Sequence, residues 1–448
     1  MIEIAISEDD LGKVKSEILN PDEERCAVLL ASSISKKSGL VRLIVQNIEI
    51  PQQGDYQEKG PCGVTLRPSF VANVVKKAKI SSQSVIFVHS HVAPKPPLFS
   101  IVDDGGEVHL RTFLEKRIPG QYHAALVIST GGLRARQLGT KTEARVISLG
   151  HRREILFDPC AEVGPTDGFE ENIYDRQVRA FGELGQRAIQ DLCIGIVGLG
   201  GTGSLVAQQL VHLGVHNFIL IDPDSLEISN LNRIPNASNK DVGKSKVSIA
   251  KAYIRKINKF SKVAAILGDV TKAKIARHLL ETDFIFSCTD SHGSRAVIQQ
   301  IVYQYFIPCI DMGTVISAKK GRVAHIYGRV QLLSPGLACF TCSGLLNYDE
   351  VRQDMMTQFE RKADPYFRGA RVPAPAVISL NGSVSSIAVT MFLGVVAGFP
   401  VEARYVLQNM MNSSARPVTA KPDPACFICS RSGAMGRGDQ WRLMARQD

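Results

Sequence analysis

The chain has 448 residues, 44% of them hydrophobic, and a formal net charge of +10. This length exceeds what one hydrophobic core usually holds, so two or three domains are expected. The basic residues are scattered, with no arginine-rich run or aromatic-basic stripe, which argues against a nucleic-acid-binding protein. The N-terminal residues carry no signal-peptide pattern. We therefore expect a cytoplasmic protein whose ten cysteines are thiols or metal ligands rather than disulfides.

Residues 1–155 hold short apolar runs typical of strands and one helical pattern. Strands are expected at 25–33, 40–50, 84–91 and 124–130, and a helix at 69–80. The pattern indicates a first α/β domain over residues 1–155.

A candidate metal site lies at the end of the third of these strands. His89 and His91 are two positions apart, so both imidazoles face one side of the strand. Asp103 follows as a third candidate ligand. A zinc hydrolase also needs a general base and an oxyanion stabiliser. Glu24, at the start of an early strand, is the candidate base, and Ser100 is the candidate stabiliser.

The order Glu, then H-x-H, then S-x-x-D resembles that of the JAB/JAMM metallopeptidase family. The resemblance implies that Glu24 activates the attacking water and that His89, His91 and Asp103 bind a catalytic zinc. It also implies a JAB/MPN-like α/β fold and a peptidase activity for the first domain.

Two positions depart from the family pattern. Val92 stands where a proline usually follows the second histidine, and the spacing between His91 and Ser100 is one residue longer than usual. Asp104 beside Asp103 leaves the third ligand open. The alternative is a domain of the same fold that binds a partner without cutting it.

Residues 156–172 are rich in Pro, Gly, Asp and Glu and lack an apolar period, so they are expected to form a linker. Residues 173–448 alternate strand and helix patterns, which predicts a second domain with a parallel sheet and crossover helices.

A glycine-rich phosphate loop opens the second domain. Residues 192–214 form a buried strand, a turn and an amphipathic helix that ends at Gly214. Glycines let the backbone approach a phosphate, and the helix N-terminus attracts its charge. The loop glycines are Gly198, Gly200, Gly201 and Gly203.

The next strand, 217–222, ends at Asp222, which can hold a ribose hydroxyl. Alone, this pattern also fits an NAD(P)-dependent oxidoreductase. Further polar residues favour a triphosphate instead: Arg233 and Lys246 suit phosphate oxygens, and Asp290, at the end of a strand, suits Mg²⁺. A nicotinamide cofactor needs no such groups.

Two C-x-x-C pairs occur late in the chain and together supply four thiolates. They suit a tetrahedral structural zinc, and the long gap between them means that the metal would join two distant segments. The cysteines are Cys339, Cys342, Cys426 and Cys429.

Residues 173–430 resemble the ThiF/MoeB/ubiquitin-activating-enzyme family. The resemblance rests on "YDRQVRAFG", "GLGGTG", "DPDSLEISNLNR", "VGKSK", "CTDS" and the two cysteine pairs. It implies a Rossmann-like domain in which ATP and Mg²⁺ adenylate the C-terminal glycine of a small ubiquitin-like or sulfur-carrier protein with a β-grasp fold.

The resemblance also implies roles for single residues. Asp222 and Asp224 would serve the ribose and the nearby metal–phosphate region, and Asp290 would bind Mg²⁺. The phosphates would be bound by Asn232, Arg233 and Lys246. Arg176 matches an arginine that the family inserts from the partner subunit, so a homodimer is implied.

Two further segments bear on function. The apolar run 376–401 is long enough to span a membrane, but it falls where the family has a buried helix, so no membrane is expected. Residues 343–425 contain no cysteine, so we expect adenylation without a thioester on this crossover segment. Cys62 and Cys160, in loops, stay open as thioester sites.

The leading hypothesis is a bifunctional enzyme that adenylates the C-terminus of a ubiquitin-like protein and cleaves the bond after it. A non-catalytic scaffold and an oxidoreductase are the alternatives. A downstream partner for conjugation or for sulfur transfer is left open.

Overall fold

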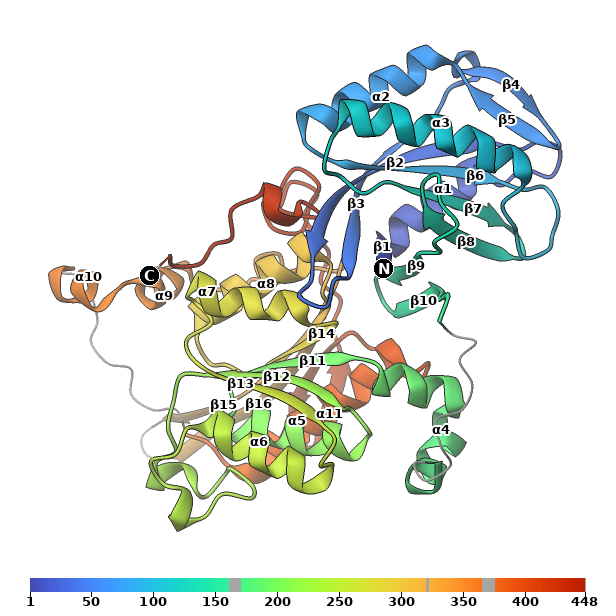
Figure 1. Cartoon of the computed structure of the whole chain (residues 1–448). Helices are drawn as coiled ribbons and strands as arrows, with labels where there is room; N and C mark the ends of the chain where they lie inside the picture. Colours follow the sequence, from blue (N-terminus) through green and yellow to red (C-terminus); the bar gives the residue numbers. More distant parts are fainter. Residues whose placement is uncertain (161–170, 320–321, 365–374, 448) are drawn as a thin grey trace. The chain divides into compact units, whose positions relative to one another are not determined.

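The computed structural model describes residues 1–160, 171–319, 322–364 and 375–447. The chain divides into two compact units (Figure 1). The first contains the N-terminal residues with Gln304–Phe306 and Arg431–Arg442, and the second contains the other described residues. Part of the predicted linker lies outside the described residues. Its start belongs to strand β10 (Arg153–Phe157) and its end to helix α4 (Glu171–Gln190).

The first unit is built on an eight-stranded mixed sheet with the order β10-β9-β1-β3-β2-β6-β7-β8. The four predicted strands and the predicted helix α2 (Pro68–Ile80) are confirmed. A two-stranded hairpin, β4 (Tyr56–Gly60) and β5 (Gly63–Leu66), stands apart from this sheet. The sheet strands are β1 (Ile2–Ser7), β2 (Cys26–Ser35), β3 (Val41–Glu49), β6 (Ser84–Ser90), β7 (Ala124–Ser129), β8 (Gly132–Gln137), β9 (Arg145–Leu149) and β10.

Both faces of this sheet are apolar, because its strands carry consecutive apolar residues and successive side chains of a strand point to opposite faces. On β2, Ala27 and Leu29 join a cluster with helix α1 (Glu8–Ile18). Val28 and Leu30 join a second cluster with α2 and α3 (Ile101–Arg117). Figure 1 shows α2 and α3 together over one face. The first unit is therefore a helix-covered sheet with cores on both sides.

Residues 431–442 fold with the first unit, although the sequence pattern groups them with the second domain. The Ser32 hydroxyl donates to the Gly436 carbonyl at 2.7 Å, and the Gln440 amide donates to the Ser81 carbonyl at 2.6 Å. Arg431 bonds Asp10. These contacts join residues hundreds of positions apart, which local patterns in the sequence do not reveal.

The second unit contains an eight-stranded sheet with the order β13-β12-β11-β14-β15-β16-β17-β18. The expected parallel sheet is correct only for β11 to β15; β15, β16, β17 and β18 pair antiparallel. Only two residues connect β15 and β16, too few for a parallel crossover. The strands are β11 (Cys193–Val197), β12 (Asn217–Asp222), β13 (Lys262–Leu267), β14 (Phe284–Ser287), β15 (Cys309–Lys319), β16 (Arg322–Leu333), β17 (Tyr405–Asn409) and β18 (Ser414–Pro417).

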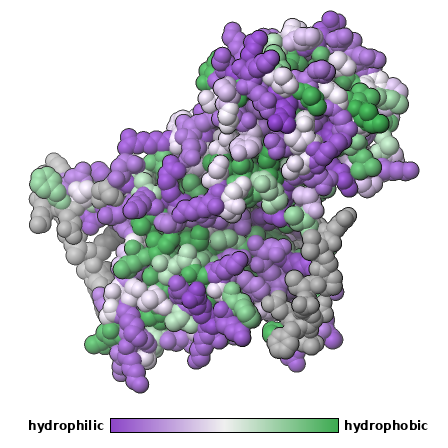
Figure 2. Space-filling view, viewed as in Figure 1, coloured by the Kyte–Doolittle hydropathy of each residue, from purple (hydrophilic) through white to green (hydrophobic). Residues whose placement is uncertain are grey.

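The main core of this unit includes residues of α5 (Gly201–His212), α6 (Lys246–Ile257) and α11 (Ile378–Val396), together with Ile189 of α4. In the described part of the chain, α11 is the one helix long and apolar enough to cross a membrane, and half of its most apolar window is buried. Figure 2 shows hydrophobic and hydrophilic residues interspersed on the visible surface. The remaining helices are α7 (Ala273–Ala276), α8 (His292–Tyr305), α9 (Tyr348–Met355) and α10 (Gln358–Ala363).

The chain direction across the sheet reverses beside β11. From β11 the chain proceeds to β12 and β13 on one side, whereas β14 and β15 lie on the other. The carboxyl ends of β11 and β14 therefore meet at a topological switch point, where open α/β sheets bind ligands.

Candidate active sites

The glycine-rich loop lies at this switch point. Gly198, directly after β11, has φ +89°, and a Cβ built on it would lie 2.6 Å from the Cys288 carbonyl oxygen. A Cβ on Gly203 would lie 1.8 Å from the Gly198 carbonyl oxygen. A Cβ on Gly200 would meet nothing within 4 Å. The fold therefore requires glycine at positions 198 and 203, where a side chain would clash with the backbone. Gly200, before the first turn of α5, instead leaves room for a ligand.

Asp222 holds this loop from the end of β12. Its carboxylate accepts the Leu199 N–H at 2.5 Å and the Asp224 N–H at 2.8 Å. Burial raises the pKa of Asp222, while the Leu199 N–H and the nearby Lys246 oppose that rise. The predicted contact of Asp222 with a ribose stays a prediction.

Lys246 and Asp224 are brought together by pairing of two loops. Leu226 donates its N–H to the Lys244 carbonyl, and Ser225 bridges to Ser245. This pairing places Lys246 Nζ 2.7 Å from Asp224 Oδ2. The lysine side chain is mostly buried, and the carboxylate is mostly exposed.

Arg233 lies over the first turn of α5. Its Cδ is 3.4 Å from a Cβ built on Gly201, and its Nη1 donates to the Ser229 carbonyl at 2.6 Å and to Asn232 Oδ1 at 3.2 Å. The side chains of Asn232 and Arg233 are therefore coupled beside the glycine-rich loop.

Two predicted residues are less closely tied to this group. The strand expected to end at Asp290 ends at Ser287, because Cys288 makes the last ladder bond, to Val197, before the chain turns. Asp290 is exposed in the loop before α8. Arg176 is exposed on α4, and no hydrogen bond or ion pair joins it to another described residue.

The sequence reasoning missed two buried polar residues near the loop. Asn381 of α11 is 4% exposed, and its Nδ2 lies 2.2 Å from a Cβ built on Gly201. Asp311 of β15 bonds Ser287 at 2.8 Å and pairs with Arg295 and Arg329. Burial alone would raise the pKa of Asp311, but the two arginines lower it. An asparagine inside an apolar helical run was the available signal for Asn381.

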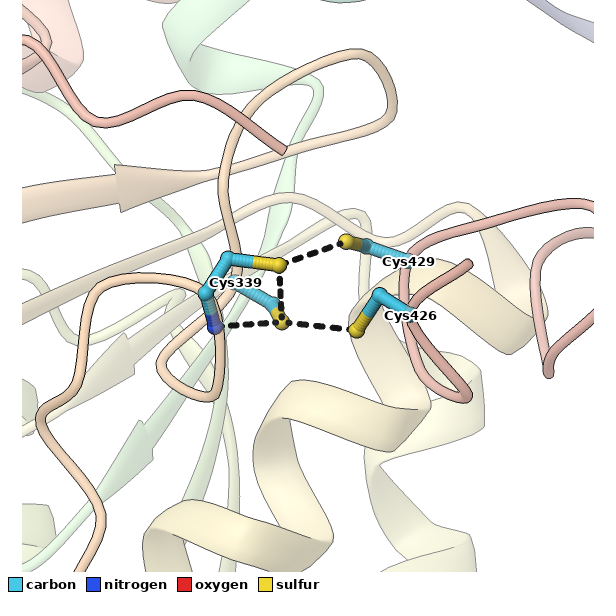
Figure 3. Close-up of side chains that lie close together, drawn as sticks. Cys339, Cys426 and Cys429 are labelled. Atoms are coloured by element: carbon cyan, nitrogen blue, oxygen red, sulfur yellow. Dashed lines mark hydrogen bonds between the residues drawn. The ribbon is translucent and has the colours of Figure 1, made fainter. Parts of the chain in front are cut away.

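The two C-x-x-C pairs meet in one cluster within the second unit (Figure 3). The Sγ–Sγ distances are 3.7 Å for Cys339–Cys342, 3.6 Å for Cys339–Cys426 and 3.5 Å for Cys342–Cys429. Four sulfurs at ~2.3 Å from a tetrahedral zinc would be ~3.8 Å apart. Hydrogen bonding from Cys429 lowers the pKa of Cys339 to about 5. The cluster therefore fits a closed zinc site.

A second cluster lies in the first unit. His89 Nε2 is 3.3 Å from His91 Nε2 and 3.4 Å from Asp103 Oδ1. Two nitrogens at ~2.05 Å from a tetrahedral zinc would be ~3.3 Å apart. Burial lowers the pKa of His89 to about 4, which keeps its ring neutral as ligation requires. The extra residue before Ser100 does not keep these three side chains apart.

Glu24 lies beside this cluster, in the loop that precedes β2 rather than in the strand itself. Its Oε1 is 4.0 Å from His91 Nε2. Burial and the Asp103 carboxylate raise the pKa of Glu24 to about 7. Its N–H donates to the Gly60 carbonyl at 2.8 Å, so the β4–β5 hairpin adjoins the predicted base.

Ser100 and Asp103 form a capping box at the start of α3. The Ser100 N–H donates to Asp103 Oδ2 at 2.6 Å, and the Asp103 N–H donates to Ser100 Oγ at 3.2 Å. Asp103 Oδ1 remains directed at His89. Asp104 is engaged elsewhere, by Arg136 at 2.8 Å and Lys141 at 2.5 Å. The proximity to His89 therefore favours Asp103 as the third ligand.

Comparison with known proteins locates a family match in the second half of the chain: the ThiF family matches residues 174–428. Molybdopterin-synthase adenylyltransferase of Escherichia coli (strain K12) is 27% identical over 263 residues, covering 58% of this chain and 96% of that protein. Ubiquitin-like modifier-activating enzyme 5 of Xenopus laevis is 25% identical over 255 residues, covering 53% of this chain and 59% of that protein. The crystal structure of E. coli MccB with ATP aligns at 19% identity and TM-score 0.46, covering 58% of this chain and 74% of that chain; this likeness adds nothing to the sequence match.

Proposed function

The chain belongs to the ThiF family, and from this premise we propose that it adenylates the C-terminal glycine carboxylate of a small β-grasp protein at the expense of ATP. The observation that carries the proposal is the group formed by Lys246, Arg233 and the open Gly200 around the first turn of α5. The names of two relatives support this substrate class: one is an adenylyltransferase of molybdopterin synthase, and the other activates a ubiquitin-like modifier.

In the proposed reaction a carboxylate oxygen of the terminal glycine attacks the α-phosphorus of ATP. The bond between that phosphorus and the α,β-bridging oxygen breaks, and pyrophosphate leaves. Lys246 and Arg233 would neutralise the charge that collects on the leaving phosphates. The backbone N–H groups at the start of α5 would receive phosphate oxygens. Mg²⁺, when held by Asp290, would supply further neutralisation.

The test is exchange of labelled pyrophosphate into ATP. The probe is a ubiquitin-like protein ending in Gly-Gly, and the control is the same protein without its last glycine. Exchange that occurs with the full-length probe but not with the shortened control supports the proposal. An oxidoreductase would instead reduce or oxidise a nicotinamide cofactor without exchange, and a scaffold would bind the probe without exchange.

We propose that the chain acts as a homodimer in which Arg176 reaches the partner's nucleotide site. Its exposed position on α4, with no bonded neighbour among the described residues, supports this role. Because residues 343–425 hold no cysteine, we also propose that the product stays an adenylate until a downstream conjugating or sulfur-transfer protein accepts it in the cytoplasm. A thiol-labile adduct on Cys62 or Cys160 would contradict this.

For the first unit we propose a JAB/JAMM-like zinc peptidase that cleaves the bond after the same terminal glycine. The fit of His89, His91 and Asp103 to zinc–ligand distances supports it. When bound there, zinc would acidify the attacking water. Glu24 would take the proton from that water, and Ser100 would face the oxyanion. Cleavage of a linear fusion after Gly-Gly tests the activity. A partner-binding domain without cleavage is the alternative outcome.

A further inference from the structure

We propose that Phe99 and Arg136 are positioning residues for the metal site of the first unit. Phe99 would hold the His89 ring, and Arg136 would hold Phe99 while keeping Asp104 away from the metal. This inference rests on the proposed zinc site, because it concerns how two protein side chains orient its ligands.

Arg136, on β8, is buried and pairs with the buried Glu107 and the partly exposed Asp104. Its Nη2 donates to Glu107 Oε1 at 2.9 Å, and its Nε donates to Glu107 Oε2 at 3.0 Å. Its Nη1 donates to Asp104 Oδ1 at 2.8 Å. Lys141 supplies a second positive charge to Asp104, so two cations balance two carboxylates. The Arg136–Glu107 pair is buried, and a buried ion pair whose charges are hydrogen-bonded is rigid.

Phe99 connects this group to the metal site. The Arg136 guanidinium carbon lies 3.9 Å from the Phe99 ring centroid, a close cation–π stack. Phe99 also contacts His89, whose ring meets the Phe99 ring edge-on with centroids 6.3 Å apart. Phe99 therefore contacts both the paired Arg136 cation and a candidate metal ligand.

The His89 side chain is mostly buried, but no described residue gives it the hydrogen bond that usually orients a metal-bound histidine. Metal-bound histidines usually donate the second ring nitrogen to a carboxylate or carbonyl, which fixes the ring. Within the described residues, no hydrogen bond reaches His89 Nδ1; its one ring contact besides His91 is Phe99. Packing against Phe99 thus takes the place of the usual hydrogen bond.

The same ionic group selects between two adjacent carboxylates. Asp104 accepts Arg136 on Oδ1 and Lys141 on Oδ2, so both of its oxygens are bonded. Among the described residues, the Asp103 carboxylate accepts a hydrogen bond only from the Ser100 N–H, through Oδ2, and keeps Oδ1 near His89. Adjacent residues on a helix point about 100° apart, so pinning Asp104 also fixes the direction of Asp103.

The experiment measures zinc per chain in the full-length protein during competition with chelators of graded affinity. The Cys339 cluster provides an internal reference in each sample. We expect two zinc ions in the wild type. We expect Phe99→Leu to lower the affinity of the histidine site about 10- to 100-fold, and Phe99→Tyr, which keeps the ring, to stay within about threefold of the wild type. A leucine of similar apolar character would suffice if Phe99 only filled space.

The aspartates give an independent comparison. Asp103→Asn is expected to abolish the second zinc, whereas Asp104→Asn retains it. Equal loss of the second zinc in both aspartate variants, or wild-type zinc affinity in Phe99→Leu, would overturn this inference. Neither result would contradict the proposed zinc site of the wild type. A wild type that binds zinc at the cysteine cluster alone would instead overturn the proposed metal site itself.

Discussion

Lys246 and Asp224 form a 2.7 Å ion pair although they lie 22 positions apart in the chain. The pair joins the loop after β12 to the first residue of α6, beside the glycine-rich turn. In this position the lysine is fixed before any nucleotide arrives, so its charge needs no reorganisation to meet a phosphate.

Replacement of Lys246 by alanine is therefore expected to lower pyrophosphate exchange by about 10²- to 10³-fold, as loss of a preorganised charge does. Lys244→Ala is the matched control, because Lys244 pairs with Asp241 at 2.9 Å on the protein surface. Its exchange rate should stay within about twofold of the wild type. Similar losses in both variants would show that general surface charge, rather than the position of Lys246, matters.

The glycines of the loop should separate stability from activity. Gly203→Ala is expected to lower the free energy of unfolding by about 1–3 kcal/mol, because its Cβ meets the Gly198 carbonyl. Gly200→Ala should leave this free energy within about 0.5 kcal/mol, because its Cβ meets open space. It should nevertheless lower nucleotide affinity. Denaturant unfolding and nucleotide titration measure the two effects, and unchanged affinity in Gly200→Ala would contradict the proposed approach of a phosphate.

Mixing two inactive variants tests the proposed homodimer. Arg176→Ala and Lys246→Ala are each expected to be inactive, and their mixture should regain about a quarter of the wild-type exchange rate. In the mixture, half of all dimers pair one chain of each variant, and each such dimer has one intact site out of two. Arg179→Ala, on the same helix and paired with Asp175, is the control and should stay active. A mixture without activity would place Arg176 in its own chain's site or outside any site.

Removal of the cysteine cluster should release one zinc and destabilise the second unit. Cys339→Ser is expected to lose that zinc, because Cys339 is buried at the centre of the four thiols. Cys160→Ser, an exposed thiol outside the cluster, should retain it. Elemental analysis and thermal unfolding check both results. Full zinc content in Cys339→Ser would rule out this cluster as the metal site.

The sequence predicted the elements whose signals are local. Apolar runs located β2, β3, β6 and β7, and Gly214, with φ +96°, follows α5 as expected of a helix C-terminus. The end of β14 was missed because the sequence carries no signal for where pairing with β11 stops: Cys288 makes the last bond, to Val197, and Asp290 lies in the loop beyond it. The antiparallel strands β16 to β18 were missed because strand direction depends on partners distant in the chain.

The candidate sites show the same division. Motif spacing identified His89 and His91 in one candidate metal site and the four cysteines in another. Within each site the fold brings the candidate ligand atoms close together. Arg136 and Asn381 carry no motif. Their positions follow from packing of β8 and α11 against segments far away in the sequence, so only the folded chain reveals them.

The path of the C-terminal residues limits how this protein can be divided. Cys426 and Cys429 belong to the second unit, residues 431–442 complete the first, and Leu443 returns to the second. An N-terminal fragment produced alone would expose the Ser32 hydroxyl and the Asp10 carboxylate that Gly436 and Arg431 engage in the whole chain. No single proteolytic cut yields both units complete. A gene fusion or truncation that divides the chain at one position between the two units would leave at least one unit without some of its residues.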